Sequence, residues 1–128
     1  MTIVGNCPCS GVNLDRMLRP AILACLAKSD RHGYAMLAEL EAMPLFKGGL
    51  PDLTGVYRCL HEMEEEGLLV GSWDAPARGR ARRVFQITAD GLACLARWKG
   101  TLDAYDTAIR DLRRRMQRAL TASRKREG

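Results

Sequence analysis

Arginines gather in one short stretch in the second half of the chain. Four of the six residues from 78 to 83 are arginines, with no carboxylate among them: Arg78, Arg80, Arg82 and Arg83. A guanidinium group binds phosphate oxygens through a rigid fork of N–H donors. The stretch therefore predicts contact with the phosphates or the minor groove of a nucleic acid. The alternative interpretation is a solvated turn.

A second candidate contact lies at the start of a helix predicted from residue 53 onward. Thr54 and Gly55 are small, so this helix N-terminus can approach phosphates or base edges closely, and its free N–H groups attract anions. Arg58 lies one turn further on the same face, where it can bind guanine O6 and N7 or a phosphate. The alternative for Arg58 is an ion pair with Glu62, four residues on. The candidate DNA contacts are therefore Thr54, Gly55, Tyr57, Arg58, Arg78, Arg80, Arg82 and Arg83.

Two of the five cysteines differ in setting from the others. Cys25, Cys59 and Cys94 fall within helical patterns, where a free cysteine packs as a small apolar residue. Cys7 and Cys9 flank a proline in an N-terminal arm, and two thiols alone cannot complete a tetrahedral metal site. With ligands from a second copy of the chain they could hold a thiophilic metal, or they could form a redox pair. The alternative is an irregular arm with incidental thiols, and we expect no other cofactor.

One further motif resembles an enzyme signature without completing it. His61 and Glu62 begin like the helical motif of zinc proteases, but the second histidine at the fourth following position is missing. Residue 63, a methionine, is needed for the core of the same helix. We therefore expect no enzymatic activity.

Composition and charge agree with a small folded protein that has a polyanionic partner. Hydrophobic residues make up 47% of the 128 residues, and the formal net charge is +5. Fourteen basic residues follow position 75, against five acidic ones, and they come after an acidic cluster at Glu62, Glu64, Glu65 and Glu66. This asymmetry favours a directed field toward a nucleic acid. No apolar run approaches the roughly 20 residues of a membrane span, and no secretory signal begins the chain, so we expect a cytoplasmic protein.

The first half of the chain predicts three helices. A stripe from Leu14 to Leu26 indicates a first helix capped by Asn13, with a kink or break at Pro20. Residues 30–33 predict a turn. A second helix follows with Tyr34, Leu37 and Leu40 facing inward, and residues 43–52 form a loop. A third helix begins after Asp52, turns residues 53, 56, 57, 60 and 63 inward, and ends at Gly67.

Two short strands follow, at residues 68–73 and 82–88, around a turn rich in Pro, Gly and Arg. Alternation places Arg82 and Arg83 on opposite faces, so one of the two is expected to reach DNA. The fold class is mainly α with a small β-hairpin: a winged helix-turn-helix domain plus a long C-terminal dimerisation helix. The expected parts are an arm at 1–12, the winged helix at 13–88, the long helix at 89–121 and a basic disordered tail at 122–128.

The long helix, capped by Thr88, carries two series of apolar residues seven positions apart. They form an a/d seam typical of helices that pair with a second chain. The predicted dimerisation residues are Leu95, Trp98, Leu102, Tyr105, Ile109, Leu112 and Met116. The alternative is a helix that folds back on the first helix of its own chain. Trp98 and Tyr105 could also line a pocket for a small-molecule effector, although aromatic residues at this spacing are commonly core.

Five segments occur in an order typical of one family. They are residues 22–26 (ILACL), 32–34 (HGY), 55–60 (GVYRCL), 63–69 (MEEEGLL) and 82–91 (RRVFQITADG). Together they resemble the PadR family of bacterial transcriptional regulators from residue 18 to about 95. The chain departs from the usual family pattern in its Cys-Pro-Cys arm, in Pro20 and in its Gly-rich loop at 43–52.

The resemblance implies a dimeric repressor with a three-helix core, a β-wing and a C-terminal dimerisation helix. We therefore expect a sequence-specific regulator that binds double-stranded DNA as a homodimer, with no membrane partner. The alternative is a winged-helix module for protein interaction, or for sensing thiols or metals, that does not read DNA. The arginine-rich wing distinguishes the two, because an interaction module has no need of it.

Overall fold

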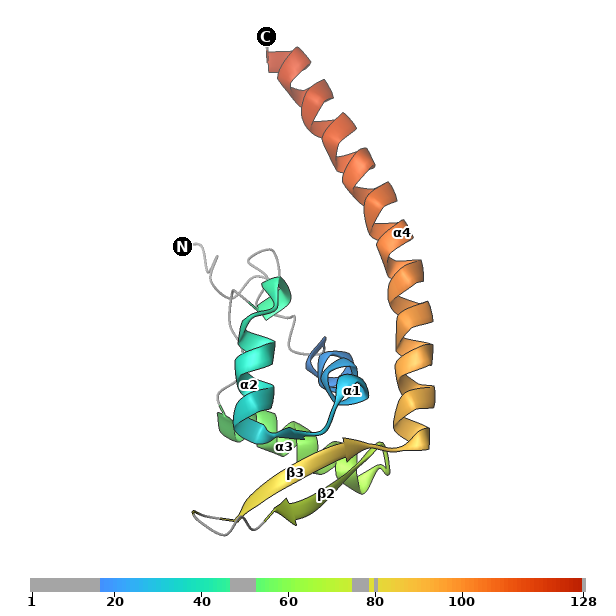
Figure 1. Cartoon of the computed structure of the whole chain (residues 1–128). Coiled ribbons are helices and arrows are strands. Elements are labelled where there is room, and N and C mark those ends of the chain that lie inside the picture. The colour runs from blue at the N-terminus through green and yellow to red at the C-terminus, as the bar shows by residue number, and fades with distance from the viewer. Residues whose placement is uncertain (1–16, 47–52, 75–78, 80, 128) are drawn as a thin grey trace. The chain divides into compact units, whose positions relative to one another are not determined.

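A computed structural model describes residues 17–46, 53–74, 79 and 81–127 (Figure 1). The helices are α1 (Leu18–Lys28), α2 (Gly33–Glu41), α3 (Leu53–Glu65) and α4 (Ala89–Glu127), with a short 3-10 helix at Pro44–Phe46. The strands are β1 (Arg31–His32), β2 (Leu69–Asp74) and β3 (Arg82–Ile87). The predicted order of three helices, a hairpin and a long helix is confirmed. The predicted caps Asn13 and Asp52 lie outside the described residues.

Pro20 does not interrupt α1, which runs unbroken from Leu18 to Lys28. The helix begins at Leu18, so the proline lies in its first turn, where an N–H group has no partner inside the helix to lose. Nearly every side chain of α1 from Leu18 to Leu26 is buried, including Ile22 and Leu23 at 0% exposure. α1 is therefore the central helix of the core, and the predicted interruption is wrong for the described helix.

The predicted turn at 30–33 contains a strand. β1 pairs antiparallel with β3, with Arg31 opposite Phe85 and His32 opposite Val84, so the sheet has the order β1-β3-β2. A side-chain hydrogen bond of 2.8 Å from Gln86 Nε2 to Asp30 Oδ2 supports the same edge. A strand of two residues has too little sequence for an alternating pattern, and only the neighbouring β3 gives its backbone partners.

The prediction for α2 is right at one end and wrong at the other: Leu40 is buried at 0% exposure, Leu37 is half-buried, and Tyr34 is exposed. Its buried residues are Gly33, Met36 and Leu40, whereas the side chain of Tyr34 is 72% exposed. Met36 and Leu40, four positions apart, lie on one face of the helix, and Tyr34 falls outside it. Gly33 lies so close to the Tyr57 hydroxyl of α3 that a β-carbon there would overlap it.

α3 separates a buried from an exposed face: Val56, Leu60 and Met63 are all at 0% exposure, whereas Thr54, Arg58 and His61 are exposed. Its end is a Schellman motif: the Leu68 N–H donates to the Met63 carbonyl and the Gly67 N–H to the Glu64 carbonyl, both at 3.0 Å. Gly67 has φ +79°, the left-handed region that an L side chain adopts at a cost. The prediction that Gly67 ends this helix is confirmed.

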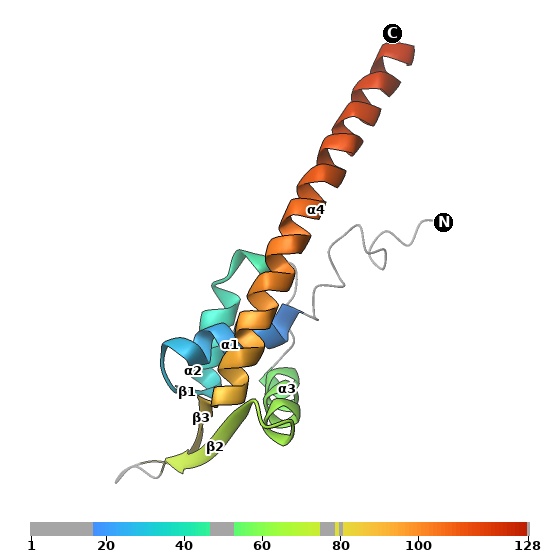
Figure 2. The same ribbon diagram turned by 90° about the vertical axis from the view of Figure 1, so that its right-hand side faces the viewer.

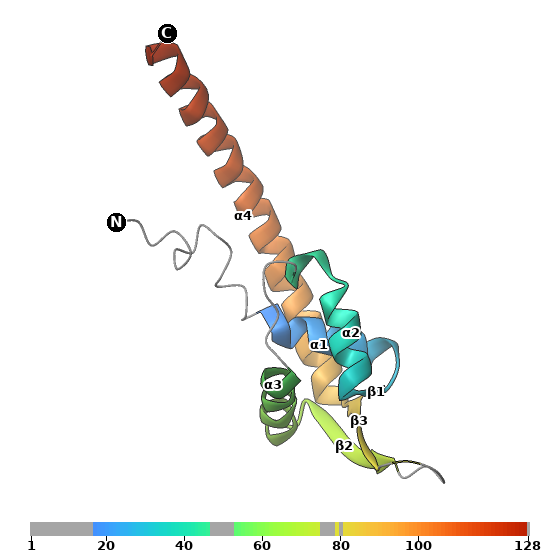
Figure 3. The same cartoon turned by 90° about the vertical axis from the view of Figure 1, so that its left-hand side faces the viewer.

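The hairpin is antiparallel from Leu69 opposite Ile87 to Asp74 opposite Arg82. α1 contacts β3, while α3 packs beside β2, as Figures 1 and 3 show. Leu69 and Phe85 on the inner face are 2% and 3% exposed, which closes the core against the helices. The hairpin thus stands next to α3, the arrangement that a winged helix requires.

α4 begins as predicted and extends further than predicted. The Thr88 hydroxyl accepts a 3.0 Å hydrogen bond from the Gly91 N–H, an N-cap, and also donates to the Gly67 carbonyl at 2.7 Å. The helix continues without a break to Glu127 (Figure 2), so residues 122–127 are helical rather than a disordered tail. The chain divides into two compact units at Leu95, within this helix. Within the described residues, no helix is both long and apolar enough to cross a membrane.

Candidate nucleic-acid interface

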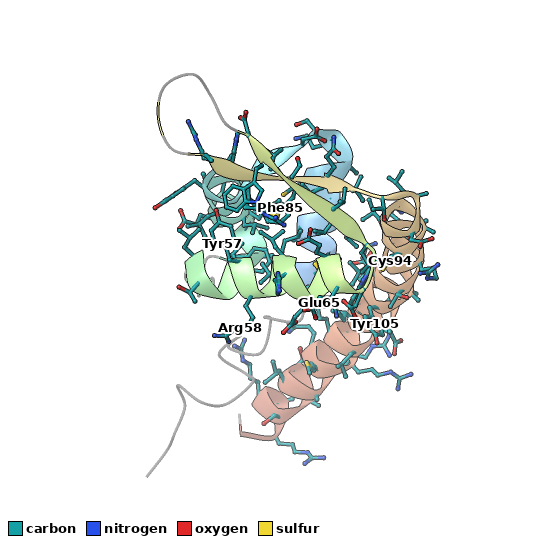
Figure 4. All side chains as sticks on the ribbon, turned by 90° about the horizontal axis from the view of Figure 1, so that it is seen from below. Tyr57, Arg58, Glu65, Phe85, Cys94 and Tyr105 are labelled. Atoms are coloured by element: carbon teal, nitrogen blue, oxygen red, sulfur yellow. The ribbon has the colours of Figure 1, made fainter. Side chains whose placement is uncertain are left out.

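The outward face of α3 presents the residues that the sequence singled out. Thr54 and Arg58 are exposed, and Gly55 between them is half-buried. Figure 4 shows Arg58 extending from α3 away from the labelled ring of Phe85. No ion pair joins Arg58 to Glu62 among the residues that the structure describes, whereas His61 lies 3.5 Å from Glu65. The Arg58 guanidinium is therefore available to an external anion.

Tyr57 has a different surrounding from its neighbour Arg58. It is half-buried, and its ring centroid lies 6.4 Å from that of Phe85 on β3 at an interplanar angle of 54°. Figure 4 shows the two rings between α3 and the sheet. Tyr57 thus joins the helix to the hairpin, while one side of it still borders the groove described next.

An open groove of about 560 Å³ separates the exposed side of α3 from the inner face of the hairpin. The α3 residues contribute one wall and the strands the other. The lining residues are Thr54, Tyr57, Arg58, His61, Glu64, Trp73, Arg83 and Phe85. Four of the predicted DNA contacts, Thr54, Tyr57, Arg58 and Arg83, therefore come together from segments up to 29 positions apart in the sequence.

Arg83 is already bound within the domain. Its Nη2 donates to both carboxylate oxygens of Glu64, at 2.8 and 3.0 Å, and the two side chains are 29% and 24% exposed. Its guanidinium carbon also lies 5.5 Å from the ring centroids of Trp73 and Phe85. The sequence predicted a DNA contact for Arg83, whereas the structure gives it an intramolecular carboxylate, because Glu64 at the end of α3 faces the hairpin.

Arg82 projects on the other side of the strand and is exposed, next to Asp74 in the strand register. The predicted division of Arg82 and Arg83 between opposite faces is thus what the strand shows. The predicted contacts Arg78 and Arg80 lie outside the described residues. Gly79 between them has φ +100°, a conformation typical of a glycine in a tight turn.

All seven predicted dimerisation residues lie on α4. Tyr105, Ile109, Leu112 and Met116 are each 51–54% exposed, and Leu120, which the sequence analysis did not include, is 60% exposed. A large aliphatic or aromatic side chain at each of these heptad-spaced positions leaves an apolar stripe along one side of the helix. A groove of about 560 Å³ beside this stripe is lined by Arg110, Arg113, Arg114, Met116, Gln117 and Leu120.

The described cysteines are not joined by a disulfide bond, and they lie inside or at the edge of the core. Cys25 is buried, while Cys59 and Cys94 are half-buried. Burial raises the pKa of the Cys59 thiol above its usual 9.0; the Arg19 guanidinium opposes this rise and the Glu62 carboxylate adds to it. Across the described ranges, no group of three His, Cys, Asp or Glu side chains is placed to hold a metal ion. The predicted thiol site at Cys7 and Cys9 lies outside them.

Three residues of this region escaped the sequence analysis: Glu64, Gly71 and Trp73. The Gly71 N–H donates a 2.8 Å hydrogen bond to Glu64 Oε2, and Trp73 is 66% exposed on the wall of the groove. Glu64 was one of four acidic residues in a row of five, and nothing in the local pattern marked it out. Pairing the two strands so that Trp73 lies opposite Arg83 would have indicated that Trp73 and Arg83 share one face of the hairpin, because cross-strand partners do.

Comparison with known proteins agrees with this architecture. The family model of the transcriptional regulator PadR-like family matches residues 22–97, more than half of the chain. No curated protein sequence matches the chain. The fold is similar to that of TA0346, a proposed transcriptional regulator from Thermoplasma acidophilum, at 25% identity and a TM-score of 0.68, covering 77% of this chain and 92% of that one.

Two further solved structures share the fold. The PadR-like regulator BC4206 of Bacillus cereus is 24% identical with a TM-score of 0.67, covering 77% of this chain and 93% of that one. PadR of Bacillus subtilis, solved in complex with operator DNA, is 22% identical with a TM-score of 0.58, over 65% of this chain and 46% of that one. A family of regulators confirms the expectation that the chain is not an enzyme. With its three-helix core, its wing and a family match over most of the winged helix, the chain belongs to the PadR-like family of transcriptional regulators.

Proposed function

We propose that this regulator is a homodimeric repressor that binds operator DNA through the start of α3 and the wing. The observation that carries the proposal is the exposed Arg58 beside Thr54, on a helix face with no local carboxylate engaging that guanidinium among the described residues. An exposed arginine at this position can form a bidentate contact to guanine or bind a phosphate. That the Bacillus subtilis relative binds operator DNA supports the same role.

The proposed dimer uses the apolar stripe of α4. Burying a large aliphatic side chain stabilises an interface by about 1.5–3 kcal/mol, and exposed stripes of this kind are uncommon on monomeric proteins. Ile109, Leu112 and Met116 provide three such side chains per chain, and the ring of Tyr105 adds an aromatic surface. A twofold dimer presents two reading helices to two half-sites, as regulators of this type require. Bound at an operator, such a dimer would block transcription.

Replacing Arg58 tests the DNA contact. Arg58→Ala is expected to weaken binding to a duplex selected by the wild-type protein from a random library by about 1–3 kcal/mol. A plot of log affinity against log salt is expected to lose about one unit of slope per protomer if a phosphate contact is lost, and to keep its slope if a base contact is lost. Fluorescence anisotropy at several salt concentrations measures both quantities.

The matched control is Arg124→Ala, which removes the same charge from the exposed end of α4. It changes the net charge of the chain by as much as Arg58→Ala does. Because an exposed charge that makes no contact with DNA is screened by salt, the affinity for the selected duplex is expected to stay within about twofold of wild type. Equal losses in the two variants would mean that Arg58 acts only through net charge, and the proposed contact would be wrong.

A further inference from the structure

One carboxylate connects the end of α3 to both strands of the hairpin. Glu64 accepts two hydrogen bonds from Arg83 on β3, at 2.8 and 3.0 Å, and one from the Gly71 N–H on β2 at 2.8 Å. Hydrogen bonds between ionised partners are roughly twice as strong as neutral ones, and here both carboxylate oxygens are engaged. A single side chain on α3 therefore restrains two strands of the wing at once.

The strands are shaped to receive the guanidinium. Trp73 lies directly opposite Arg83 in the strand register and Gly71 opposite Phe85, so all four occupy one face of the hairpin. The guanidinium carbon is 5.5 Å from the ring centroids of both Trp73 and Phe85. It lies over Gly71 so closely that a β-carbon at that position would overlap Arg83 Nη2. A residue larger than glycine would therefore displace the Arg83 head.

We propose that Glu64 and Arg83 are positioning residues that hold the wing at a fixed angle to α3, so that both can contact one duplex. This inference rests on the proposed function, since it concerns how the same interface binds DNA. Neither residue touches DNA in this account. Arg58 on α3 and the other arginines predicted for the wing make the contacts, and the Glu64–Arg83 pair sets the distance between them.

The location of Glu64 makes the proposal testable by the sign of an effect. Its side chain lines the groove that faces the candidate DNA contacts. If the carboxylate acted only by its charge, removing that charge would strengthen binding to a polyanion. If it positions the wing, removing the charge weakens binding, because an amide has one acceptor atom where the carboxylate has two.

Glu64→Gln is therefore expected to weaken binding to the library-selected duplex by about fivefold or more, with an unchanged salt slope. Glu65→Gln is the matched control, since Glu65 lies on the same helix, is 69% exposed and has its carboxylate 3.5 Å from His61. The control is expected to bind equally or slightly more tightly. Equal or tighter binding by Glu64→Gln would overturn the proposal.

Arg83→Lys separates positioning from phosphate contact. Lysine keeps the charge and binds phosphate, but it lacks the planar guanidinium that lies over the Trp73 and Phe85 rings. A positioning role predicts that Arg83→Lys loses as much affinity as Arg83→Met, whereas near-wild-type binding by Arg83→Lys would overturn the proposal. Gly71→Ala changes no charge and removes no hydrogen-bonding group, so it is expected to weaken binding in the same direction by displacing the guanidinium.

A readout without DNA distinguishes failure of this proposal from failure of the proposed function. The chain has two tryptophans, so Trp98→Phe leaves Trp73 as the only fluorescent indole. Glu64→Gln and Gly71→Ala in that background are expected to increase acrylamide quenching of Trp73 at temperatures far below the unfolding transition. Unchanged quenching would overturn the positioning role. If the two variants change the quenching of Trp73 but the wild-type chain binds no duplex, the positioning role stands and the proposed function is wrong.

Discussion

Two arginines beside the same groove have opposite surroundings, and this difference decides their roles. Arg58 is exposed on α3 with no ion pair to Glu62 among the described residues. Arg83 is 29% exposed, bound to Glu64, and lies 5.5 Å from each of two aromatic rings. Removing one partner of a buried or half-buried ion pair costs more folding stability than the intact pair contributes, because the remaining charge is left without a partner. Arg58 is thus suited to an external anion and Arg83 to an internal one.

The thiol of Cys59 provides a prediction at the same scale. Burial is the main cause of its raised pKa, so the neutral thiol is the form that the fold favours. Just below pH 9.0, Cys59 in the native protein is therefore expected to react with iodoacetamide several times more slowly than in the unfolded chain. Mass spectrometry of the peptide that contains Cys59 measures this rate, with the protein in guanidinium chloride as the control.

The sign of the linked stability follows from the raised pKa. The contribution of the neutral Cys59 thiol is fully present below the unfolded pKa of 9.0 and is lost as the pH rises through the higher folded value. Cys59→Ser is therefore expected to flatten the fall of unfolding free energy above pH 9.0. Native-state alkylation as fast as that of the denatured chain would contradict the assignment.

At the scale of elements, the end of α3 is determined by one glycine. Gly67 has φ +79° and its added β-carbon would meet nothing within 4 Å, so its cost of substitution comes from the backbone alone. The motif also fixes where β2 starts, since Leu68 and then Leu69 follow directly.

Three local ion pairs support α4, at Lys99–Asp103, Asp106–Arg110 and Asp111–Arg115. Each contributes only about 0.3–0.5 kcal/mol.

Two glycine substitutions are expected to act in opposite directions. Gly67→Ala places an L side chain in the left-handed region and is expected to lower the free energy of unfolding by about 1 kcal/mol. Gly100→Ala, inside α4 with open space around it, is expected to raise helix stability by roughly 0.5–1 kcal/mol. Urea titrations followed by circular dichroism measure both. A shift of the two variants in the same direction would contradict the role given to Gly67.

At the scale of the whole molecule, the apolar residues of α4 need a second surface. Tyr105, Ile109, Leu112 and Met116 are all more than half exposed in the single chain, and they repeat at heptad positions. Since a C2 interface uses the same patch on both subunits, this stripe can pair with its own copy. The proposed repressor depends on that pairing, because one protomer provides only one reading helix.

Introducing a charge into the stripe tests the dimer. Ile109→Asp is expected to shift the protein to monomer at micromolar concentration, since it removes about 1.5–3 kcal/mol of apolar burial per protomer and places two carboxylates in an apolar seam. DNA affinity is expected to fall with it. Thr107→Asp adds the same charge on the opposite side of α4 and is expected to remain dimeric. Sedimentation velocity measures the oligomeric state, and an unchanged dimer in Ile109→Asp would contradict the proposed seam.

The sequence alone determined those features whose signal is local. The apolar spacing of α3 predicted its buried residues Val56, Leu60 and Met63, Gly67 predicted the helix end, and Thr88 predicted the cap of α4. Each is a matter of a few neighbouring residues, and periodicity or capping chemistry reports it directly. The outward position of Arg58 follows from the same helical spacing.

Only the tertiary structure decided what depends on residues distant in the chain. β1 exists because β3 supplies its hydrogen-bond partners, and α2 turns Met36 rather than Tyr34 inward because of what packs against it. Gly91 is required because its added β-carbon would overlap the Leu68 carbonyl, although sequence alone shows only a poor helix former. Arg83 finds Glu64 nineteen positions away. The sequence gives the charge of an arginine directly. Whether that arginine faces a carboxylate or an open groove depends on residues far away in the chain, which only the packing brings close.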